Sequence, residues 1–119
     1  MIKVITLLKR KPGLSREEFS RYWREVHAKV AREFPGSRHI RRYVQNHMMS
    51  PASLGNWPGA VNADWDGIAE VWFDSLEDLG QAMSDPEYLK VVRPDEEKFS
   101  DLSACQTFII DEHTVIDRK

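Results

Sequence analysis

The order of hydrophobic periods along the chain constrains its fold more than any other feature. Short β-rich runs predict strands over residues 2–9, 38–48, 67–74 and 104–116. Between the first and second runs, and again between the third and fourth, apolar residues recur at the three- and four-residue spacing of a helix. The predicted order is therefore strand, helix, strand, strand, helix, strand.

The first helix is predicted from Ser15 to Phe34 by local signals that agree. Ser15 and Glu18 form a capping box, in which each side chain bonds a free backbone donor at the helix start. Apolar residues at helical spacing continue until the Pro35-Gly36 pair stops the helix. These apolar residues are Phe19, Tyr22, Trp23, Val26, Val30 and Phe34.

The second helical region is predicted to start at Ser75, whose side chain can cap the helix together with Asp78. It breaks at Pro86 and resumes toward Phe99, and Pro94 predicts a kink or a restart within this part. The complete order describes a split βαβ, or ferredoxin-like, α+β sandwich. Such a sandwich has one antiparallel sheet with two helices on one face.

Composition and charge narrow the class of protein. A chain of 119 residues suits one domain that spans residues 1–119, and a net charge of −2 gives no reason to expect nucleic acid as a partner. Cys105 is the only cysteine, so an intramolecular disulfide is impossible. No leader segment is recognised and no apolar run approaches membrane-spanning length, so a soluble cytoplasmic protein that does not bind membranes is the expectation.

Three of the predicted strands are apolar on both faces. In a sheet with one face exposed to solvent, apolar and polar side chains should alternate along each strand. They do not alternate in residues 5–8, 71–73 and 108–110. Two helices can cover only one face, so a second subunit is predicted to cover the other and to form a homodimer. The alternative is that these are merely short apolar runs at strand centres.

His27 is the candidate for chemistry. On the first helix it lies within about 40° of both Trp23 and Val30, at the edge of the buried stripe. An imidazole there loses hydration, which favours its neutral, proton-accepting form. Two interpretations stay open from the helix alone: a structural histidine bonded to a backbone carbonyl, or a base in a functional site.

The connection over residues 49–64 is far longer than the roughly two to six residues that usually join such elements. Trp57 argues against simple disorder, because an indole tends to bury itself against its own domain or against a ligand. The segment is therefore predicted to be a lid that folds over the mouth of a pocket or over the neighbouring subunit.

Four segments carry a resemblance to a known family. The helix motif from Tyr22 to Ala28, together with residues 42–46, 67–73 and 84–102, resembles the EthD-domain family. That family is part of the dimeric α+β barrel group, so the resemblance implies a ferredoxin-like domain that pairs into a dimer. It also implies several cofactor-independent activities: lactone isomerases, polyketide cyclases, lyases that dehydrate or decarboxylate, and monooxygenases of aromatic compounds.

The resemblance also implies a site. It places a helix histidine at His27, a strand tyrosine at Tyr43 and a second polar residue at Asn46. His27 would remove a proton next to a carbonyl group, and Tyr43 or Asn46 would stabilise the resulting oxyanion. Strand alternation allows only one of these two to face His27. The expected ligand is small and apolar or aromatic, and its predicted contacts are Trp23, His47, Trp57, Trp65 and Trp72.

Glu70 lies in an apolar strand, where an unpaired carboxylate is costly. It is expected to pair with Arg41, Arg42 or Arg93 at the dimer contact, and a catalytic acid is the alternative. The four histidines have no metal-binding spacing and no glycine-rich phosphate loop is present, so neither a metal nor another cofactor is expected.

Two classes of function stay open. The first is a cofactor-independent enzyme that acts on a small cyclic or aromatic carbonyl compound by proton transfer through His27. The second is a non-catalytic ligand-binding or assembly protein on the same dimeric barrel. An apolar pocket that touches His27 favours the first, and a core packed solid around His27 favours the second.

Overall fold

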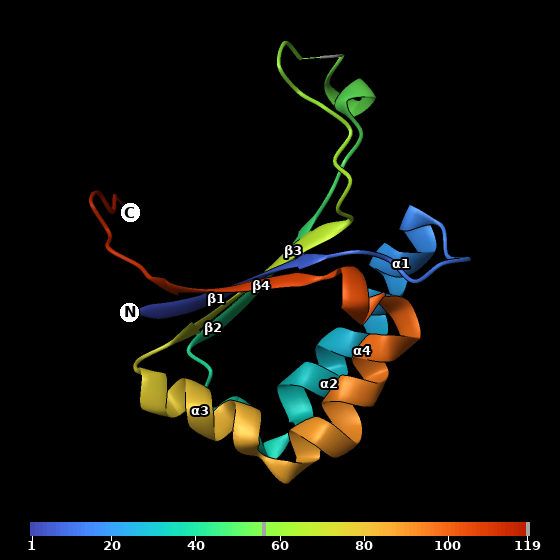
Figure 1. The fold of residues 1–119 in the computed structure, drawn as a ribbon. Coiled ribbons are helices and arrows are strands. Elements are labelled where there is room, and N and C mark those ends of the chain that lie inside the picture. The colour runs from blue at the N-terminus through green and yellow to red at the C-terminus, as the bar shows by residue number, and fades with distance from the viewer. Residues whose placement is uncertain (56, 119) are drawn as a thin grey trace.

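The computed structural model describes residues 1–55 and 57–118 of the chain. Its strands form one antiparallel sheet in the order β2-β3-β1-β4, and α1 to α4 all lie on one face of this sheet (Figure 1). The strands are β1 (Ile2–Leu8), β2 (Arg42–His47), β3 (Gly67–Phe73) and β4 (Gln106–Asp111). The predicted ferredoxin-like α+β fold is confirmed.

The first helix is continuous and has three parts: α1 (Arg16–Tyr22), a π-helical turn (Trp23–His27) and α2 (Ala28–Glu33). The predicted capping box is present, since the Glu18 N–H donates to Ser15 Oγ at 3.1 Å and the Ser15 N–H donates to the Glu18 carboxylate at 2.9 Å. The π-helical turn is not visible in the hydrophobic pattern. Turns of this kind are rare and occur frequently at functional sites.

The third helix, α3 (Leu76–Ser84), begins at the predicted cap, where the Asp78 N–H donates to Ser75 Oγ at 3.1 Å. The chain then forms a π-helical turn (Tyr88–Val92) that leads directly into α4 (Arg93–Phe99). Within the described residues, 3₁₀ turns lie at Pro35–His39, Pro51–Leu54 and Leu102–Ala104. No helix in the described ranges is long and apolar enough to span a membrane.

Pro94 does not interrupt the helix in the way the sequence predicts. The Arg93 N–H donates to the carbonyl of Tyr88 five residues earlier, and α4 continues through Pro94 as its second residue. The π-helical turn changes the hydrogen-bond register by one residue just before Pro94, which has no N–H to contribute to the continuing helix. The wider π-helical turn therefore joins the two parts of the helix without a restart.

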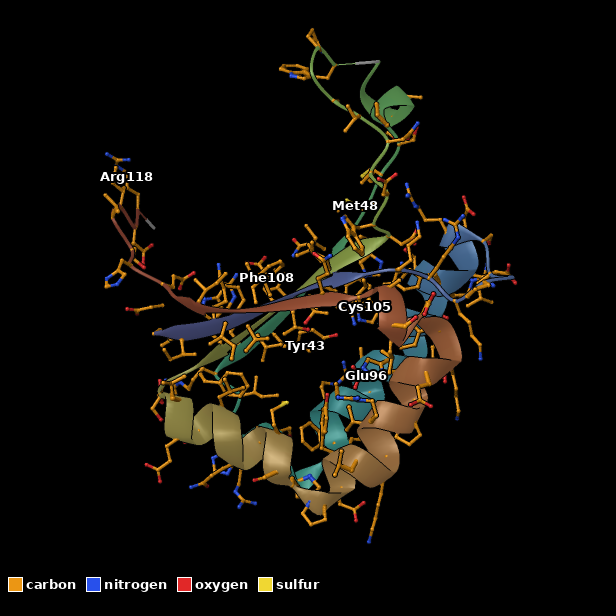
Figure 2. All side chains as sticks on the ribbon, in the orientation of Figure 1. Tyr43, Met48, Glu96, Cys105, Phe108 and Arg118 are labelled. Carbon is orange, nitrogen blue, oxygen red and sulfur yellow. The ribbon has the colours of Figure 1, made fainter. Side chains whose placement is uncertain are left out.

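Side chains alternate between two faces of the sheet. The inner face, under the helices, carries Val4, Thr6, Leu8, Tyr43, Ala69, Val71, Phe73 and Thr107. On the outer face, Ile5 lies between Glu70 of β3 and Phe108 of β4 in the strand register. Figure 2 shows Phe108 on the outer face, with Tyr43 and Glu96 between the sheet and the helices.

Within one chain the partner of Glu70 is a lysine and not the expected arginine, and an arginine at the dimer contact stays a prediction. Its carboxylate binds Lys3 Nζ at 3.1 Å and accepts a hydrogen bond from Asn46 Nδ2 at 2.9 Å. These two hydrogen bonds, from Asn46 and from Lys3, lower the pKa of Glu70. Lys3 can reach Glu70 because β1 and β3 are neighbours, and Arg42 instead stacks on Trp72 at 4.7 Å from the ring centre.

The long loop of residues 49–64 does not cover the helix side of the sheet. It projects from the end of β2 and β3, away from the helices (Figure 1), and Trp57 within it is 63% exposed. The radius of gyration, 15.4 Å, accordingly exceeds the value of about 13.5 Å for a compact domain of this length. A lid over the pocket is therefore wrong for one chain, and contact with a second subunit stays a prediction. Residue 56 lies outside the described residues.

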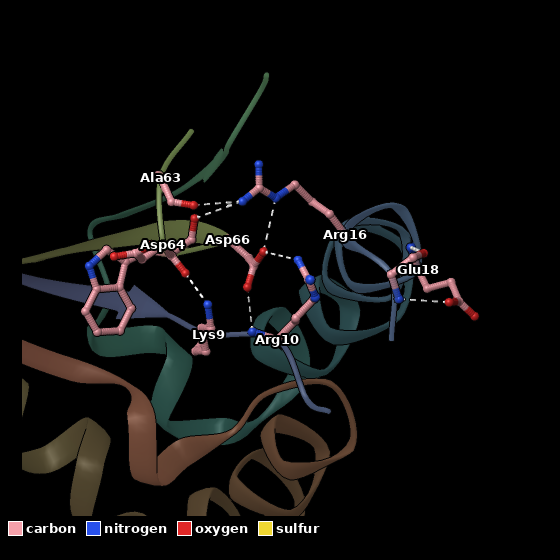
Figure 3. A network of polar contacts seen from close by, with 9 residues as sticks. Lys9, Arg10, Arg16, Glu18, Ala63, Asp64 and Asp66 are labelled. Carbon is pink, nitrogen blue, oxygen red and sulfur yellow. Dashed lines mark hydrogen bonds and ion pairs between the residues drawn. The ribbon is translucent and has the colours of Figure 1, made fainter. Parts of the chain in front are cut away.

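Asp66 anchors the base of this loop. Its buried carboxylate accepts hydrogen bonds from the Arg10 N–H and the Arg10 guanidinium, both at 2.8 Å, and from Arg16 Nε at 3.1 Å (Figure 3). Lys9 Nζ donates to the carbonyl of Asp64 beside it. Burial raises the pKa of Asp66, but the hydrogen bonds and charges of Arg10 and Arg16 together hold it below its usual value. An ionised carboxylate therefore closes the loop at its base.

Trp23 is fully buried and packs on the first residue of β3, where Gly67 leaves room for the indole. A Cβ atom on Gly67 would lie 2.5 Å from Trp23 Cζ3. We expect Gly67→Ala to lower the free energy of unfolding by about 1–3 kcal/mol, because the indole must move out of its packed position. Urea titration measures this change.

Gly80→Ala is the matched control for that substitution. Outside the adjoining backbone of α3, a Cβ on Gly80 meets no described atom within 4 Å, so alanine should raise the free energy of unfolding there by about 0.5–1 kcal/mol. If Gly67→Ala proved as stable as the unaltered protein, the close contact between Gly67 and Trp23 would be refuted.

Candidate active site

An apolar cavity of about 470 Å³ lies between the inner face of the sheet and the helices. The size and lining suit a small organic molecule. Its apolar lining includes Val4, Leu8, Ala69, Val71 and Phe73 from the strands, and Trp23, Phe34, Val92 and Phe99 from the helical side. The polar groups important for its chemistry are His27, Tyr43, Tyr88 and Glu96.

His27 lines this cavity and is held in place by Asp95 of α4. Its Nδ1 lies 2.8 Å from Asp95 Oδ2, and both side chains are buried. The ring of His27 also packs on Phe99, with 4.9 Å between the ring centres. A backbone carbonyl was the partner expected for a purely structural histidine, and the structure has a carboxylate in that place.

The carboxylate of Asp95 defines which nitrogen of His27 is left for a ligand. Tyr22 donates its hydroxyl to Asp95 Oδ1 at 2.5 Å. Burial, followed by the effect of Asp95, raises the pKa of Tyr22 to about 12, so this hydroxyl remains a donor. With Nδ1 engaged by the carboxyl group of Asp95, Nε2 is the ring nitrogen of His27 that remains for a ligand. Nε2 has no bonded partner among the described residues.

Tyr43 of β2 supplies a neutral donor at the same cavity. Its hydroxyl oxygen accepts hydrogen bonds from Trp23 Nε1 at 2.9 Å and from Gln45 Nε2 at 3.2 Å. Burial raises the pKa of Tyr43 in spite of these two donors, so the hydroxyl stays protonated. With its oxygen engaged as an acceptor, the hydroxyl hydrogen is free to bond a ligand oxygen.

Glu96 of α4 is the second acidic side chain of the site, and sequence reasoning missed both it and Asp95. The Tyr88 hydroxyl donates to Glu96 Oε1 at 3.0 Å, and Arg93 Nε lies 3.7 Å from the same oxygen. Burial raises the pKa of Glu96 above its ordinary value and outweighs the opposing influence of nearby donors and cations. All three tyrosines of the chain therefore take part in this site.

A signal for these acids is present in the sequence. Val92 and Phe99 are apolar residues of the second helical region at helical spacing, and Asp95 and Glu96 lie three or four residues from both. Acidic residues at that spacing share the buried side of the helix with the stripe. Two carboxylates on the inner side of an amphipathic helix are unusual because burial of an unpaired charge is costly.

Two predicted site residues lie on the other face of the sheet. The Asn46 amide donates to the carbonyl of Ile68 and to Glu70, both at 2.9 Å, and Trp72 Nε1 donates to Glu112 at 2.8 Å. The alternation of β2 directs Asn46 outward when Tyr43 is inward, and Trp72 is outward in the same way. Of the two alternatives on β2, Tyr43 therefore faces the cavity and Asn46 does not, and the expected contact of Trp72 with a ligand beside His27 is not formed within one subunit.

The remaining predicted contacts do not line the cavity. His47 is on the inner face, but its Nδ1 bonds Ser20 Oγ and its Nε2 bonds Gln45 Oε1, each at 2.9 Å. Trp57 lies in the projecting loop and Trp65 at its base. Of the five predicted ligand contacts, only Trp23 borders the cavity. Across residues 1–55 and 57–118, no three His, Cys, Asp or Glu side chains are grouped so that they could hold a metal ion.

The fold and the cavity define a ferredoxin-like α+β protein with an internal, mostly apolar cavity. The profile of the EthD domain matches residues 11–103, and the chain belongs to the EthD domain family. The chain is similar to the conidial pigment biosynthesis dehydratase EthD of Metarhizium robertsii, with 31% identity over 99 residues that cover 79% of this chain and 70% of that relative. It is also similar to the decarboxylase claH of Passalora fulva, with 30% identity over 105 residues that cover 84% and 68%.

Solved structures show the same fold. An EthD family protein from Bacillus halodurans superposes with a TM-score of 0.69 and 24% identity, covering 95% of this chain and 99% of that one. A dimeric protein with a ferredoxin-like fold from Bacteroides fragilis gives a TM-score of 0.63 and 17% identity, covering 93% and 95%. At these identities the likeness concerns the fold alone.

Proposed function

We propose that the protein is a cofactor-independent lyase that acts on a small cyclic or aromatic carbonyl compound. One observation carries the proposal: His27 Nδ1 is bonded to Asp95, and its Nε2 is left for an apolar cavity of about 470 Å³. The names of the two relatives, a dehydratase and a decarboxylase, support this reaction class. A cavity at His27 favours an enzyme over a non-catalytic protein of the same fold, for which a solid core was expected.

Dehydration and decarboxylation next to a carbonyl group share a chemical step. Either the loss of a proton or the loss of carbon dioxide leaves negative charge that spreads onto the carbonyl oxygen. His27 Nε2 exchanges the proton, and Asp95 holds the ring and stabilises its protonated form. Tyr43 donates its hydroxyl to the oxyanion, and Trp23 and Phe99 provide flat apolar walls.

Two small probes test this proposal. Dehydration of 3-hydroxy-1-tetralone and decarboxylation of 1-hydroxy-2-naphthoic acid both yield 1-naphthol, which is followed by its fluorescence. Turnover of either probe by metal-free protein in the presence of a chelator is the expected result. If neither probe were converted faster than the uncatalysed rate, the proposal of a lyase for compounds of this class would be refuted.

We also propose that the protein forms a homodimer through the outer face of its sheet. Ile5, Leu7, Ile68 and Phe108 bring apolar surface to this face, and Phe108 is 47% exposed in one chain. The structural neighbour from Bacteroides fragilis is described as dimeric. The apolar face opposite the helices is therefore the surface best suited to a second copy.

Phe108→Glu is expected to weaken this dimer. A carboxylate placed in the contact must lose its hydration without a partner, so the dissociation constant should rise by at least about 100-fold. Sedimentation equilibrium over a dilution series measures the change. Ile109→Glu is the control, because Ile109 is 64% exposed and alternates to the opposite face of β4. Equal effects of the two substitutions, or a monomer in the unaltered protein, would refute the interface.

A further inference from the structure

Glu96 is a polar group of the cavity that the proposed base chemistry does not use. It projects from α4 into the space between helix and sheet (Figure 2), in the same cavity as His27. Its neighbour Asp95 faces His27 and Tyr22 instead, so adjacent carboxylates of one helix have separate partners. The cavity therefore contains an oriented imidazole and a second carboxyl group that has a different hydrogen-bond partner.

The surroundings of Glu96 suit a carboxyl group that holds a proton. The Tyr88 hydroxyl donates to Oε1 at 3.0 Å, which leaves Oε2 to carry the hydrogen. Arg93 Nε is 3.7 Å from Oε1, beyond hydrogen-bond distance, and its guanidinium lies over the Tyr88 ring at 5.7 Å. No other cation is paired with Glu96 in the described part of the chain. Burial raises the pKa of Glu96 and outweighs the opposing effects of His27, Tyr88 and Arg93, which extends the pH range over which Glu96 is protonated.

We propose that Glu96 is the proton donor to a departing hydroxyl group, which makes the substrate a β-hydroxy carbonyl compound and the reaction a dehydration. This inference rests on the proposed function, because His27 is the base of the same step. His27 Nε2 takes the proton from the carbon next to the carbonyl, and that C–H electron pair becomes the new C=C bond. The bond between the β-carbon and the hydroxyl oxygen breaks, and the oxygen takes the proton of Glu96 to leave as water. Transfer of a proton from His27 to Glu96 through water restores both groups.

A base and an acid in one cavity match what such a dehydration needs. Hydroxide is a poor leaving group, so a positioned acid lowers the barrier to C–O cleavage. Decarboxylation expels neutral carbon dioxide and needs no acid at the leaving group. The two kinds of lyase therefore differ in their need for Glu96, although both use His27.

The experiment changes the leaving group of the substrate. The probes are 3-hydroxy-1-tetralone and 3-acetoxy-1-tetralone, which both give 1-naphthol by loss of water or of acetic acid. Acetate leaves without prior protonation, so only the hydroxy compound needs the acid. The proteins compared are the unaltered chain, Glu96→Gln, His27→Gln and, as a matched control on the exposed side of α4, Glu97→Gln. Rates are corrected for uncatalysed elimination.

Glu96→Gln should lower kcat for the hydroxy compound by about 10² to 10⁴ and leave the rate for the acetoxy compound close to that of the unaltered protein. His27→Gln should lower both rates, and Glu97→Gln should change neither. Equal losses on both probes with Glu96→Gln, or no loss on either, would overturn the role of Glu96 alone. Unchanged rates with His27→Gln would overturn the proposed function and the dehydration together. No turnover of either tetralone by the unaltered protein would overturn the dehydration, and it would overturn the proposed function as well if 1-hydroxy-2-naphthoic acid were also not converted.

Infrared spectroscopy gives a second readout that does not depend on turnover. The unaltered protein should show a protonated-carboxyl band at neutral pH that is absent in Glu96→Gln and present in Glu97→Gln. Thermal unfolding of the Glu96→Gln protein checks that it is folded, and glutamine has nearly the same shape as a protonated glutamate. If the band were the same in all three proteins, Glu96 would be ionised and the inference would be overturned.

Discussion

Replacement of His27 by glutamine is expected to lower turnover of 3-hydroxy-1-tetralone by about 10² to 10⁴, which corresponds to roughly 3 to 5 kcal/mol of barrier. Glutamine fills much of the imidazole volume and can still donate to Asp95, but it offers no basic nitrogen to the cavity. The measurement is kcat with saturating probe, together with thermal unfolding of the variant.

His113→Gln is the control for this substitution, because the side chain of His113 is 80% exposed and does not line the cavity. It should keep full turnover. A folded His27→Gln protein with unchanged kcat would remove the base from the mechanism. A His27→Gln protein that fails to fold would instead support the structural interpretation of this histidine, in which its bond to Asp95 serves to join the two long helices.

Tyr43→Phe is expected to lower kcat by about 10² to 10³, because it removes the hydroxyl that stabilises charge on the carbonyl oxygen. The ring stays in place, so the shape of the cavity is kept. Trp23 Nε1 and the Gln45 amide both lose their acceptor, which should also lower the free energy of unfolding by about 1–3 kcal/mol. Both quantities are measured, by steady-state kinetics and by urea titration.

The comparison of kcat with stability separates the two roles of Tyr43. A purely structural tyrosine would lower stability and leave the kcat of the folded fraction unchanged. A catalytic donor would lower the kcat of the folded protein, measured in the absence of urea. Unchanged kcat in a fully folded Tyr43→Phe protein would therefore exclude the oxyanion role.

Elements that depend on nearby residues could be predicted from the sequence. The caps at Ser15 and Ser75 are formed by partners three residues away, and both are present in the structure. Strand and helix periods likewise repeat within a few residues, and they predicted the order of the elements correctly. The EthD-family resemblance, based on motifs in the same elements, is confirmed by the match over residues 11–103.

Local sequence patterns did not predict the π-helical turns, nor that the helix continues through Pro94. A π-helical turn differs from an α-helix by one hydrogen-bond register and leaves little trace in the hydrophobic period. At Trp23–His27 it nonetheless helps to determine where the His27 ring points, since it ends at that residue. The helix was predictable in this case, and the direction of its most important side chain was not.

The sequence by itself determined the elements, their order and one candidate base, His27, since each of these depends on short-range periodicity and hydrogen bonding. Only the tertiary structure decided what surrounds that base. His27 and Asp95 are 68 positions apart, and they meet because two separate helices pack on the same sheet. The pairing register of β2 and β3 places Tyr43 toward the cavity and Asn46 away from it, because a strand directs alternate side chains to opposite faces. Contacts between distant segments depend on the packing of the whole chain, and local sequence patterns do not contain that information.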